Sequence, residues 1–187
     1  MTKTVSKQKI SIAKRIAFTA AFAALCLLGT MLLSVPLPAS GYFNTGDVFV
    51  LLSGWCLGPV FGFTAAAVGS ALADILTGYA LYAPATFLIK GLDALAAWAV
   101  WALAKKAIKK PSLDFLPRIA GAIVGEGLMV GLYFFFESVI LGLGLGAIPN
   151  ILGNALQGVC CGALGVAIVS ALYVMKPVAK FFPALHK

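Results

Sequence analysis

Long apolar stretches, broken by short runs of glycine, proline and polar residues, make up most of the sequence. The pattern predicts membrane-spanning helices at about residues 16–35, 46–57, 58–78, 84–104, 115–141 and 148–175. A helix needs about 20 apolar residues to cross the hydrocarbon core of a bilayer, so the second segment is short. Segments two and three can also be interpreted as one broken helix. The expected fold is all-α, a polytopic membrane protein whose single domain, residues 1–187, is a bundle of six transmembrane helices.

The composition excludes several soluble classes of protein. Hydrophobic residues form 61% of the chain and charged residues 11%, against about 25% charged residues in an ordinary soluble domain. A soluble globular protein, a disordered chain and a nucleic-acid-binding module are therefore excluded. The first apolar stretch is longer than the roughly 7–15 apolar residues of a secretory signal, so we expect it to be retained as a helix.

The basic residues predict how the bundle lies in the membrane. Of the 14 lysines and arginines, all but Lys90 fall in three polar segments, at residues 1–15, 105–118 and 176–187. None occurs in the predicted loops at 36–46, 78–84 and 142–148. Cytoplasmic loops of membrane proteins are enriched in Lys and Arg, so both termini, including the basic N-terminal segment 1–15, are expected to be cytoplasmic.

The ligand pattern of a zinc site and the motifs of enzyme active sites are missing from the sequence. The four cysteines lie in apolar runs without a CxxC pair, and the one histidine, His186, is next to the C-terminus. No GxSxG, P-loop or HExxH motif occurs. We therefore expect no metal, no cofactor and no enzyme activity in this chain, and any ATP would be used by partner subunits.

Polar side chains recur at helical spacing inside the predicted spans, where ionisable groups are costly and often functional. Three such stripes are Thr86, Lys90 and Asp93; Glu126, Tyr133 and Glu137; and Asn150, Asn154 and Gln157. Members of a stripe share one helix face, and the three faces should meet because facing lipid would be costly. Most of these groups fall in the half of the bundle away from the basic loops, with Asp47 and Asp74. The pattern predicts a pocket open to the outside and no path through the membrane.

Two interpretations of the polar cluster remain open. It can be a structural ion-pair network in which Lys90 is paired with Asp93 and also with Glu137. It can instead be a binding site, because five acids against one lysine leave an excess of carboxyl groups that ligand donors could satisfy. Such a site suits a small heteroaromatic compound bearing N–H and O–H groups. The aromatic residues near the same level could stack on its ring or form an interfacial belt: Tyr42, Phe43, Trp55, Tyr79 and Tyr82.

Small residues spaced four apart allow helices to approach closely. On the first predicted helix they form two overlapping ladders, Ala13, Ala17 and Ala21, and Ala20 and Ala24. These alanines can pack inside the bundle, or they can receive a helix of a partner protein near the basic end.

A series of short motifs carries a resemblance to a known family. In order they are Asn44-Thr45-Gly46-Asp47, Gly69-Ser70-Ala71-Leu72-Ala73-Asp74, Tyr82-Ala83-Pro84-Ala85-Thr86, Ile89-Lys90-Gly91, Gly131-Leu132-Tyr133-Phe134 before Glu137, and Asn150 before Asn154-Ala155-Leu156-Gln157. Their order and spacing resemble the substrate-capture (S) subunits of energy-coupling-factor (ECF) vitamin transporters. The branch around riboflavin, hydroxymethylpyrimidine and pyridoxine uptake is the most similar.

The resemblance implies a six-helix S subunit in the bacterial cytoplasmic membrane, with a vitamin pocket under the loop between the first two helices. It also implies a transmembrane coupling (T) subunit and two cytoplasmic ATPase subunits as partners, with Ala13, Ala17, Ala20, Ala21 and Ala24 at the docking surface. We expect pyridoxine or hydroxymethylpyrimidine as ligand, and riboflavin second. The expected binding residues are Asn44, Asp47, Asp74, Tyr82, Thr86, Lys90, Tyr133, Glu137, Asn150, Asn154 and Gln157. Alternative functions are a stand-alone secondary transporter or channel, which would need a polar route through the inner half, and a membrane enzyme, which would need a nucleophile or metal.

Overall fold

The computed structural model describes residues 11–37, 41–108, 110–175, 178 and 181–186. Most of the predicted N-terminal basic segment and several other basic residues lie outside this range: Lys3, Lys7, Lys9, Lys109, Lys176, Lys180 and Lys187. The long elements are α1 (Ile12–Leu32), α2 (Asp47–Leu57), α3 (Pro59–Leu76), α4 (Ala83–Ala107), α5 (Phe115–Phe135) and α6 (Ile148–Val174). A hairpin of β1 (Ser34–Pro36) and β2 (Tyr42–Asn44) joins α1 to α2. Single turns are η1 (Pro111–Leu113), the π-helical η2 (Phe136–Ile140), η3 (Gly144–Ala147) and η4 (Pro183–His186).

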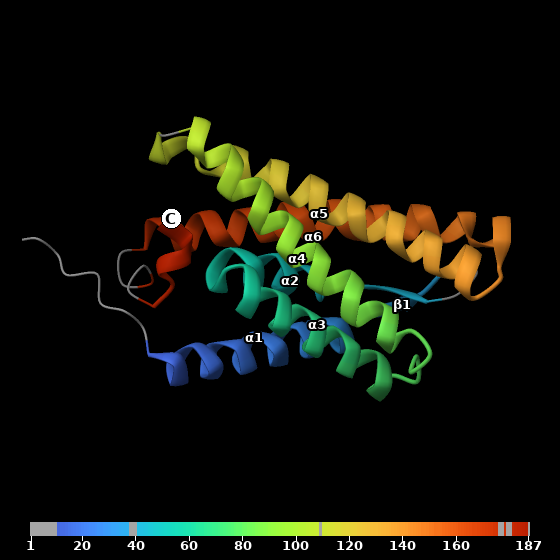
Figure 1. Ribbon diagram of the computed structural model, residues 1–187. Helices are drawn as coiled ribbons and strands as arrows, with labels where there is room; N and C mark the ends of the chain where they lie inside the picture. Colours follow the sequence, from blue (N-terminus) through green and yellow to red (C-terminus); the bar gives the residue numbers. More distant parts are fainter. Residues whose placement is uncertain (1–10, 38–40, 109, 176–177, 179–180, 187) are drawn as a thin grey trace, which may run out of the picture.

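The structure confirms the all-α helical bundle, and it changes the expected role of the second helix. In the described chain, five helices are long and apolar enough to cross a membrane, whereas α2 is a shorter apolar helix. The residues of α2 are almost all buried, and the helix lies among the other helices of the bundle (Figure 1). It is separate from α3, because Gly58 between them has a φ of 84° and Pro59 begins the next helix. The expectation of one broken helix is therefore wrong.

Small residues hold the helices at short distance. A Cβ atom added to Gly54 of α2 would lie 2.3 Å from the carbonyl oxygen of Ala94 on α4. A Cβ added to Gly121 of α5 would lie 2.4 Å from the carbonyl oxygen of Ala97. Real Cβ atoms do not approach oxygen so closely, so glycine allows backbone to touch backbone at these crossings.

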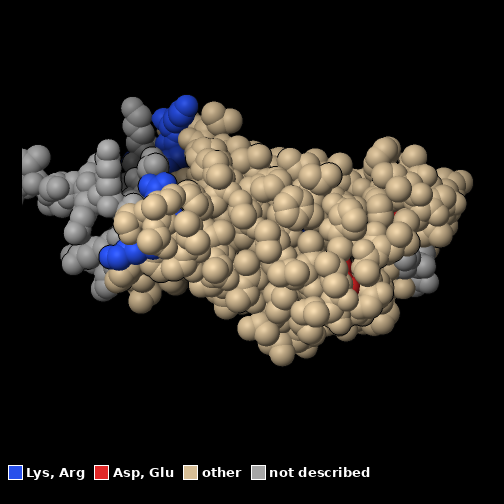
Figure 2. Space-filling view, turned by 60° about the horizontal axis from the view of Figure 1, so that its bottom comes forward, with Lys and Arg blue, Asp and Glu red and all other residues tan. Residues whose placement is uncertain are grey.

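Apart from the buried Lys90, the described basic side chains gather at one end of the bundle. Figure 2 shows them on the visible face at that end, and Figure 1 places the start of α1 and the C-terminal turn η4 there too. We call this the basic end; it includes Arg15, Lys105 and Lys106. The hairpin and the connections from α3 to α4 and from α5 to α6 lie at the opposite end.

A cluster of buried side chains around Arg118 lies at the basic end, where the sequence predicts a polar segment. Arg118 belongs to α5 and is fully buried, with its Nε donating to Asp114 Oδ2 at 2.7 Å and its Nη2 donating to the Leu185 carbonyl at 3.2 Å. Its guanidinium carbon is 4.6 Å from the centre of the Trp101 ring. Arg118 lies at the end expected for the basic segment 105–118, but it is buried within α5, because its carboxylate partner and the aromatic ring allow burial.

Candidate ligand pocket and the polar network beneath it

The hairpin between α1 and α2 forms one wall of a cavity at the opposite end. Its strands pair antiparallel, with Ser34 opposite Asn44 and Pro36 opposite Tyr42. Leu37 N–H donates to the Gly41 carbonyl at 3.0 Å, and Gly41 has a φ of 74°, a value that favours glycine. The hairpin directs Tyr42 and Asn44 toward the helices.

The cavity is narrow and lined by mostly polar side chains. The centre of a water-sized molecule can move in about 30 Å³ of it. Its lining residues are Thr30, Leu37, Gly41, Tyr42, Asn44, Ser70, Tyr82, Thr86, Lys90, Tyr133, Glu137, Asn154 and Gln157. Eight of the predicted binding residues therefore line one cavity, namely Asn44, Tyr82, Thr86, Lys90, Tyr133, Glu137, Asn154 and Gln157.

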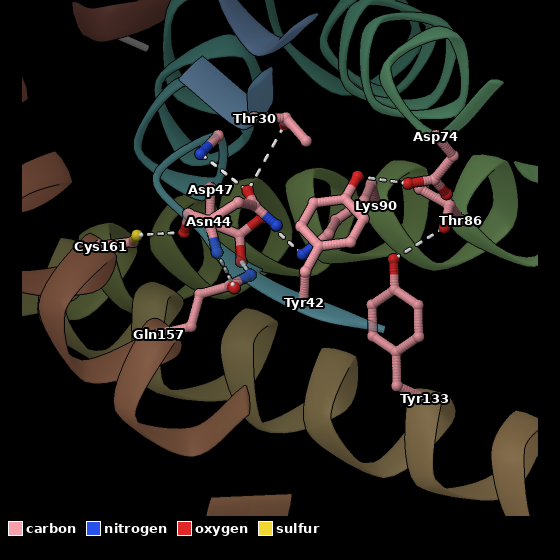
Figure 3. Close-up of polar contacts among 11 residues, drawn as sticks. Thr30, Tyr42, Asn44, Asp47, Asp74, Thr86, Lys90, Tyr133, Gln157 and Cys161 are labelled. Atoms are coloured by element: carbon pink, nitrogen blue, oxygen red, sulfur yellow. Dashed lines mark hydrogen bonds and ion pairs between the residues drawn. The ribbon is translucent and has the colours of Figure 1, made fainter. Parts of the chain in front are cut away.

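Lys90 and Gln157 connect this cavity to Asp47 at the start of α2. Lys90 Nζ lies 2.5 Å from Asp47 Oδ1, and both side chains are at most 3% exposed. Gln157 Nε2 donates to the other carboxylate oxygen of Asp47, and its Oε1 accepts from Asn44 N–H at 2.6 Å (Figure 3). The hairpin, α2, α4 and α6 thus share one hydrogen-bond network.

The ion pair differs from the predicted one. The structural interpretation of the cluster paired Lys90 with Asp93, three residues along the same helix face, and also with Glu137. Lys90 binds Asp47 instead, because α2 enters the bundle and brings its first carboxylate directly to the lysine. Lys90 Nζ also lies 5.3 Å from the centre of the Tyr133 ring. Asp47 was expected at the outer start of a span, whereas it is fully buried.

The other polar stripes meet as their spacing predicts. The hydroxyls of Thr86 and Tyr133 are 2.9 Å apart, which joins α4 to α5. Glu137 accepts from Asn150 Nδ2 at 3.0 Å and from the Tyr82 hydroxyl at 3.2 Å. Side chains from α4, η2 and α6 therefore contact one another.

Tyr42 and Asp74 form a second contact between the hairpin and the helices. The Tyr42 hydroxyl donates to Asp74 Oδ1 at 2.5 Å (Figure 3). Burial, followed by the negative charge of Asp74, raises the pKa of the Tyr42 phenol. Tyr42 therefore stays a neutral donor at physiological pH.

Three predicted binding residues lie behind the cavity wall rather than on it. Asp47 lies beneath Lys90, Asp74 binds Tyr42, and Asn150 binds Glu137. Each orients a lining residue. These three do not line the present cavity, because helical spacing identifies a polar face but not which member of it reaches the cavity; their contact with a ligand stays a prediction.

Tyr42, Tyr79 and Tyr82 lie near the cavity, as expected, whereas Trp55 does not. The rings of Tyr42 and Tyr79 have centres 4.6 Å apart, and Tyr79 in turn contacts Tyr82. These three rings lie beside the cavity. Trp55 is buried toward the basic end, where its Nε1 donates to the Ala97 carbonyl at 3.2 Å and Arg118 approaches its ring.

Sequence reasoning missed several lining residues. Thr30 and Ser70 are single hydroxyls in apolar helices, and Leu37 and Gly41 belong to the hairpin. The Ser70 hydroxyl is buried and has no hydrogen-bond partner among the described residues. A hydroxyl within an apolar run at the same depth as the stripes was the one available signal.

The alanine ladders lie on the face of α1 that points away from the bundle. Ala13, Ala17, Ala20, Ala21 and Ala24 are all exposed. The helix packs on α3 through its other side, where a Cβ added to Gly69 would lie 2.3 Å from the Ala23 carbonyl oxygen. Internal packing of these five alanines is therefore excluded within the described chain.

The long apolar helices and the buried polar cavity define a multi-pass membrane protein with a site for a small polar solute. Residues 9–176 match the family of the ECF-type riboflavin transporter S component, and the chain belongs to that family. A protein of Pyrococcus woesei described as "Uncharacterized protein in gap 3'region" is 33% identical over 150 residues, covering 79% of this chain and 91% of the relative.

Family membership confirms the resemblance and settles the general function. The protein is the substrate-binding subunit of a vitamin transporter and is not an enzyme. Membership also implies partnership with a transmembrane coupling subunit and ATPase subunits.

Proposed function

We propose that this protein captures a single-ring heteroaromatic vitamin or precursor, of the pyridoxine or hydroxymethylpyrimidine class, from the outer side of the bacterial cytoplasmic membrane. The polar lining of the buried cavity carries this proposal. It combines the carboxylate of Glu137 with the amides of Asn154 and Gln157. Such groups accept and donate hydrogen bonds in the plane of a ring bearing hydroxyl and amino groups.

The tyrosines support an aromatic ligand. Tyr42, Tyr82 and Tyr133 all line the cavity, so a flat ring entering it would meet ring faces as well as polar groups. Offset or edge contacts between aromatic rings contribute about 0.5–1.5 kcal/mol beyond burial. A purely aliphatic polar solute would leave this aromatic wall without a complementary surface.

Binding requires the cavity to widen, and the hairpin is the element that we propose to move. Ligand pockets usually measure about 300–1,000 Å³, far more than the space now open. The hairpin is held by side-chain contacts such as Tyr42 to Asp74 and Asn44 to Gln157, which ligand groups could replace. A single ring demands less opening than the three fused rings of riboflavin.

Riboflavin is the second candidate. The observation in its favour is the description of the matching family, which names a riboflavin transporter component. Its larger ring system would need the hairpin to move further from Tyr82 and Glu137.

Orientation and energy supply follow from the two ends of the bundle. We place the basic end, with Lys105 and Lys106, in the cytoplasm by the positive-inside rule (Figure 2). Trp55, Trp101 and Arg118 are fully buried near that end, which does not favour a stand-alone transporter or channel. Uptake then depends on the coupling subunit, which we propose docks on the exposed alanines of α1, and on ATP used by the ATPase subunits.

Equilibrium dialysis of the purified protein with labelled pyridoxine, hydroxymethylpyrimidine and riboflavin tests the proposal. We expect one of the single-ring compounds to bind most tightly. Glu137→Gln and Asn154→Leu should each weaken it about ten- to a hundredfold, as loss of a charge-assisted hydrogen bond costs about 1.5–3 kcal/mol. Val159→Leu, at an exposed position on α6, is the control and should bind like the original protein.

Tight binding of riboflavin alone would transfer the assignment to the second candidate. If none of the three compounds binds, the proposed ligand class is wrong. If a single-ring compound binds equally well to both pocket variants, the site lies elsewhere.

A further inference from the structure

Three carboxyl groups from three helices converge beneath the ligand cavity. Asp47 on α2, Asp93 on α4 and Glu126 on α5 each place one oxygen within 4.8 Å of the others. All three residues are at most 5% exposed. Lys90 and Gln157, which bind Asp47, also line the cavity, so this acidic cluster lies one layer below its floor.

Two of the three carboxyl groups are buried without donors. Both oxygens of Asp93 and both oxygens of Glu126 accept no hydrogen bond from any described residue. Asp47, in contrast, receives Lys90 on one oxygen and Gln157 on the other. A buried carboxylate without a donor costs several kcal/mol, so the four oxygens of Asp93 and Glu126 require a positively charged or protonated partner.

The neighbouring helices leave room for these two carboxyl groups. A Cβ added to Gly125 would lie 2.5 Å from Asp93 Oδ1, and a Cβ added to Gly158 would lie 3.3 Å from Glu126 Oε2. Glycine at both positions brings the carboxyl groups together from different helices instead of separating them.

If all three carboxyl groups of the cluster are ionised, two negative charges stay uncompensated. Lys90 offsets one carboxylate, and the N-terminus of α2 further favours the negative charge of Asp47. The other buried cation in the described chain, Arg118, is paired with Asp114 at the basic end. Asp93 and Glu126 therefore have no protein cation of their own.

We propose that Asp93 and Glu126, together with Asp47, bind a divalent cation of the calcium type. Carboxylate oxygens are the ligands that Ca²⁺ prefers, at about 2.3–2.6 Å. Three oxygens within 4.8 Å of one another lie at most about 2.8 Å from a common point, so small side-chain shifts would bring all three into this range. The two uncompensated charges equal those of a divalent ion. Mg²⁺ fits less well because it usually keeps several waters, and the site is almost closed to solvent.

Thermal unfolding of the purified, chelator-treated protein with CaCl₂, MgCl₂ or NaCl at constant ionic strength tests this site without any vitamin. We expect Ca²⁺ at about a hundredfold its Kd to raise Tm by about 5–10 °C, with Mg²⁺ and Na⁺ giving much less. Asp93→Asn and Glu126→Gln should abolish the Ca²⁺ effect. The matched control is Glu137→Gln, which should keep the Ca²⁺ effect. Glu137 is a buried glutamate of η2 that already accepts two hydrogen bonds.

Binding of ⁴⁵Ca²⁺ to the original protein gives a second measurement that does not depend on variants folding. One ion per chain is expected. The proposal would be overturned if the protein retained no ⁴⁵Ca²⁺, or if its Tm did not change with any cation and rose only as the pH fell. Either result would show that protons neutralise Asp93 and Glu126. Stabilisation by Na⁺ alone would overturn the divalent assignment. These results are independent of which vitamin binds above the cluster.

Discussion

Replacing Lys90 by methionine removes the positive charge that contacts Asp47 while keeping most of the side-chain volume. With Nζ and Oδ1 2.5 Å apart, the Coulomb attraction is about 7 kcal/mol at an effective dielectric constant of 20. Desolvation of the two groups offsets part of this energy. Removal of one partner of a buried pair typically costs about 3–5 kcal/mol, because the other charge stays buried. We therefore expect Lys90→Met to lower Tm by about 6–20 °C.

Loss of Lys90 and loss of Asp47 should lower the stability by different amounts. Asp47→Asn leaves Lys90 with the carboxyl groups of Asp93 and Glu126 close by, so it should cost less than Lys90→Met. The double variant Lys90→Met/Asp47→Asn should be more stable than Lys90→Met alone. Differential scanning fluorimetry of all four proteins in the same detergent measures this cycle. Additive losses, or a Lys90→Met protein as stable as the original, would refute the inferred ion pair.

Three further predictions concern the surface, the packing and the topology. Ala21→Leu, on the exposed face of α1, should leave Tm and vitamin binding of the solitary protein unchanged and abolish co-purification with the coupling subunit; intact complexes would exclude α1 as the docking helix. Gly54→Ala should cost about 1–3 kcal/mol because its Cβ would meet the Ala94 carbonyl oxygen. Gly127→Ala, where nothing lies within 4 Å, is its control, and equal stability of the two variants would contradict the packing. A cysteine at Leu145, which is 79% exposed, in a background without native cysteines should react with an impermeant maleimide from outside; reaction only from the cytoplasm would reverse the topology.

The helices could be predicted from the sequence because their signals are local. Apolar length identified the five long helices, and α6 begins at Ile148 as expected. Helical spacing also identified six residues that line one cavity, whereas Asn44 and Tyr82 were expected from the family motifs. Polar groups at i, i+4 and i+7 share a face whatever the rest of the fold does, so this inference needs no tertiary information.

Features that depend on distant contacts could not be predicted. The burial of α2 places Asp47 against Lys90 and sends Trp55 to the basic end, yet nothing within residues 47–57 marks that helix as central. The hairpin is short and lacks an alternating pattern, since Pro36 ends one strand. Arg118 resembles a loop charge until Asp114 and Trp101 surround it.

The glycine crossings divide the bundle into parts of unequal stiffness. Backbone meets backbone where Gly69 faces Ala23, where Gly62 faces Ser53, where Gly54 faces Ala94 and where Gly121 crosses α4. By contrast, the glycines of α6 that face the bundle approach only side chains, such as Gly158 beside Glu126. Backbone-to-backbone crossings leave no adjustable side chain to absorb motion, so α1 to α5 should move as one block. Exchange of backbone amide hydrogens with deuterium should accordingly be slowest in α2 and α4. It should be faster in α6, the helix whose side-chain amides, those of Asn154 and Gln157, line the ligand cavity.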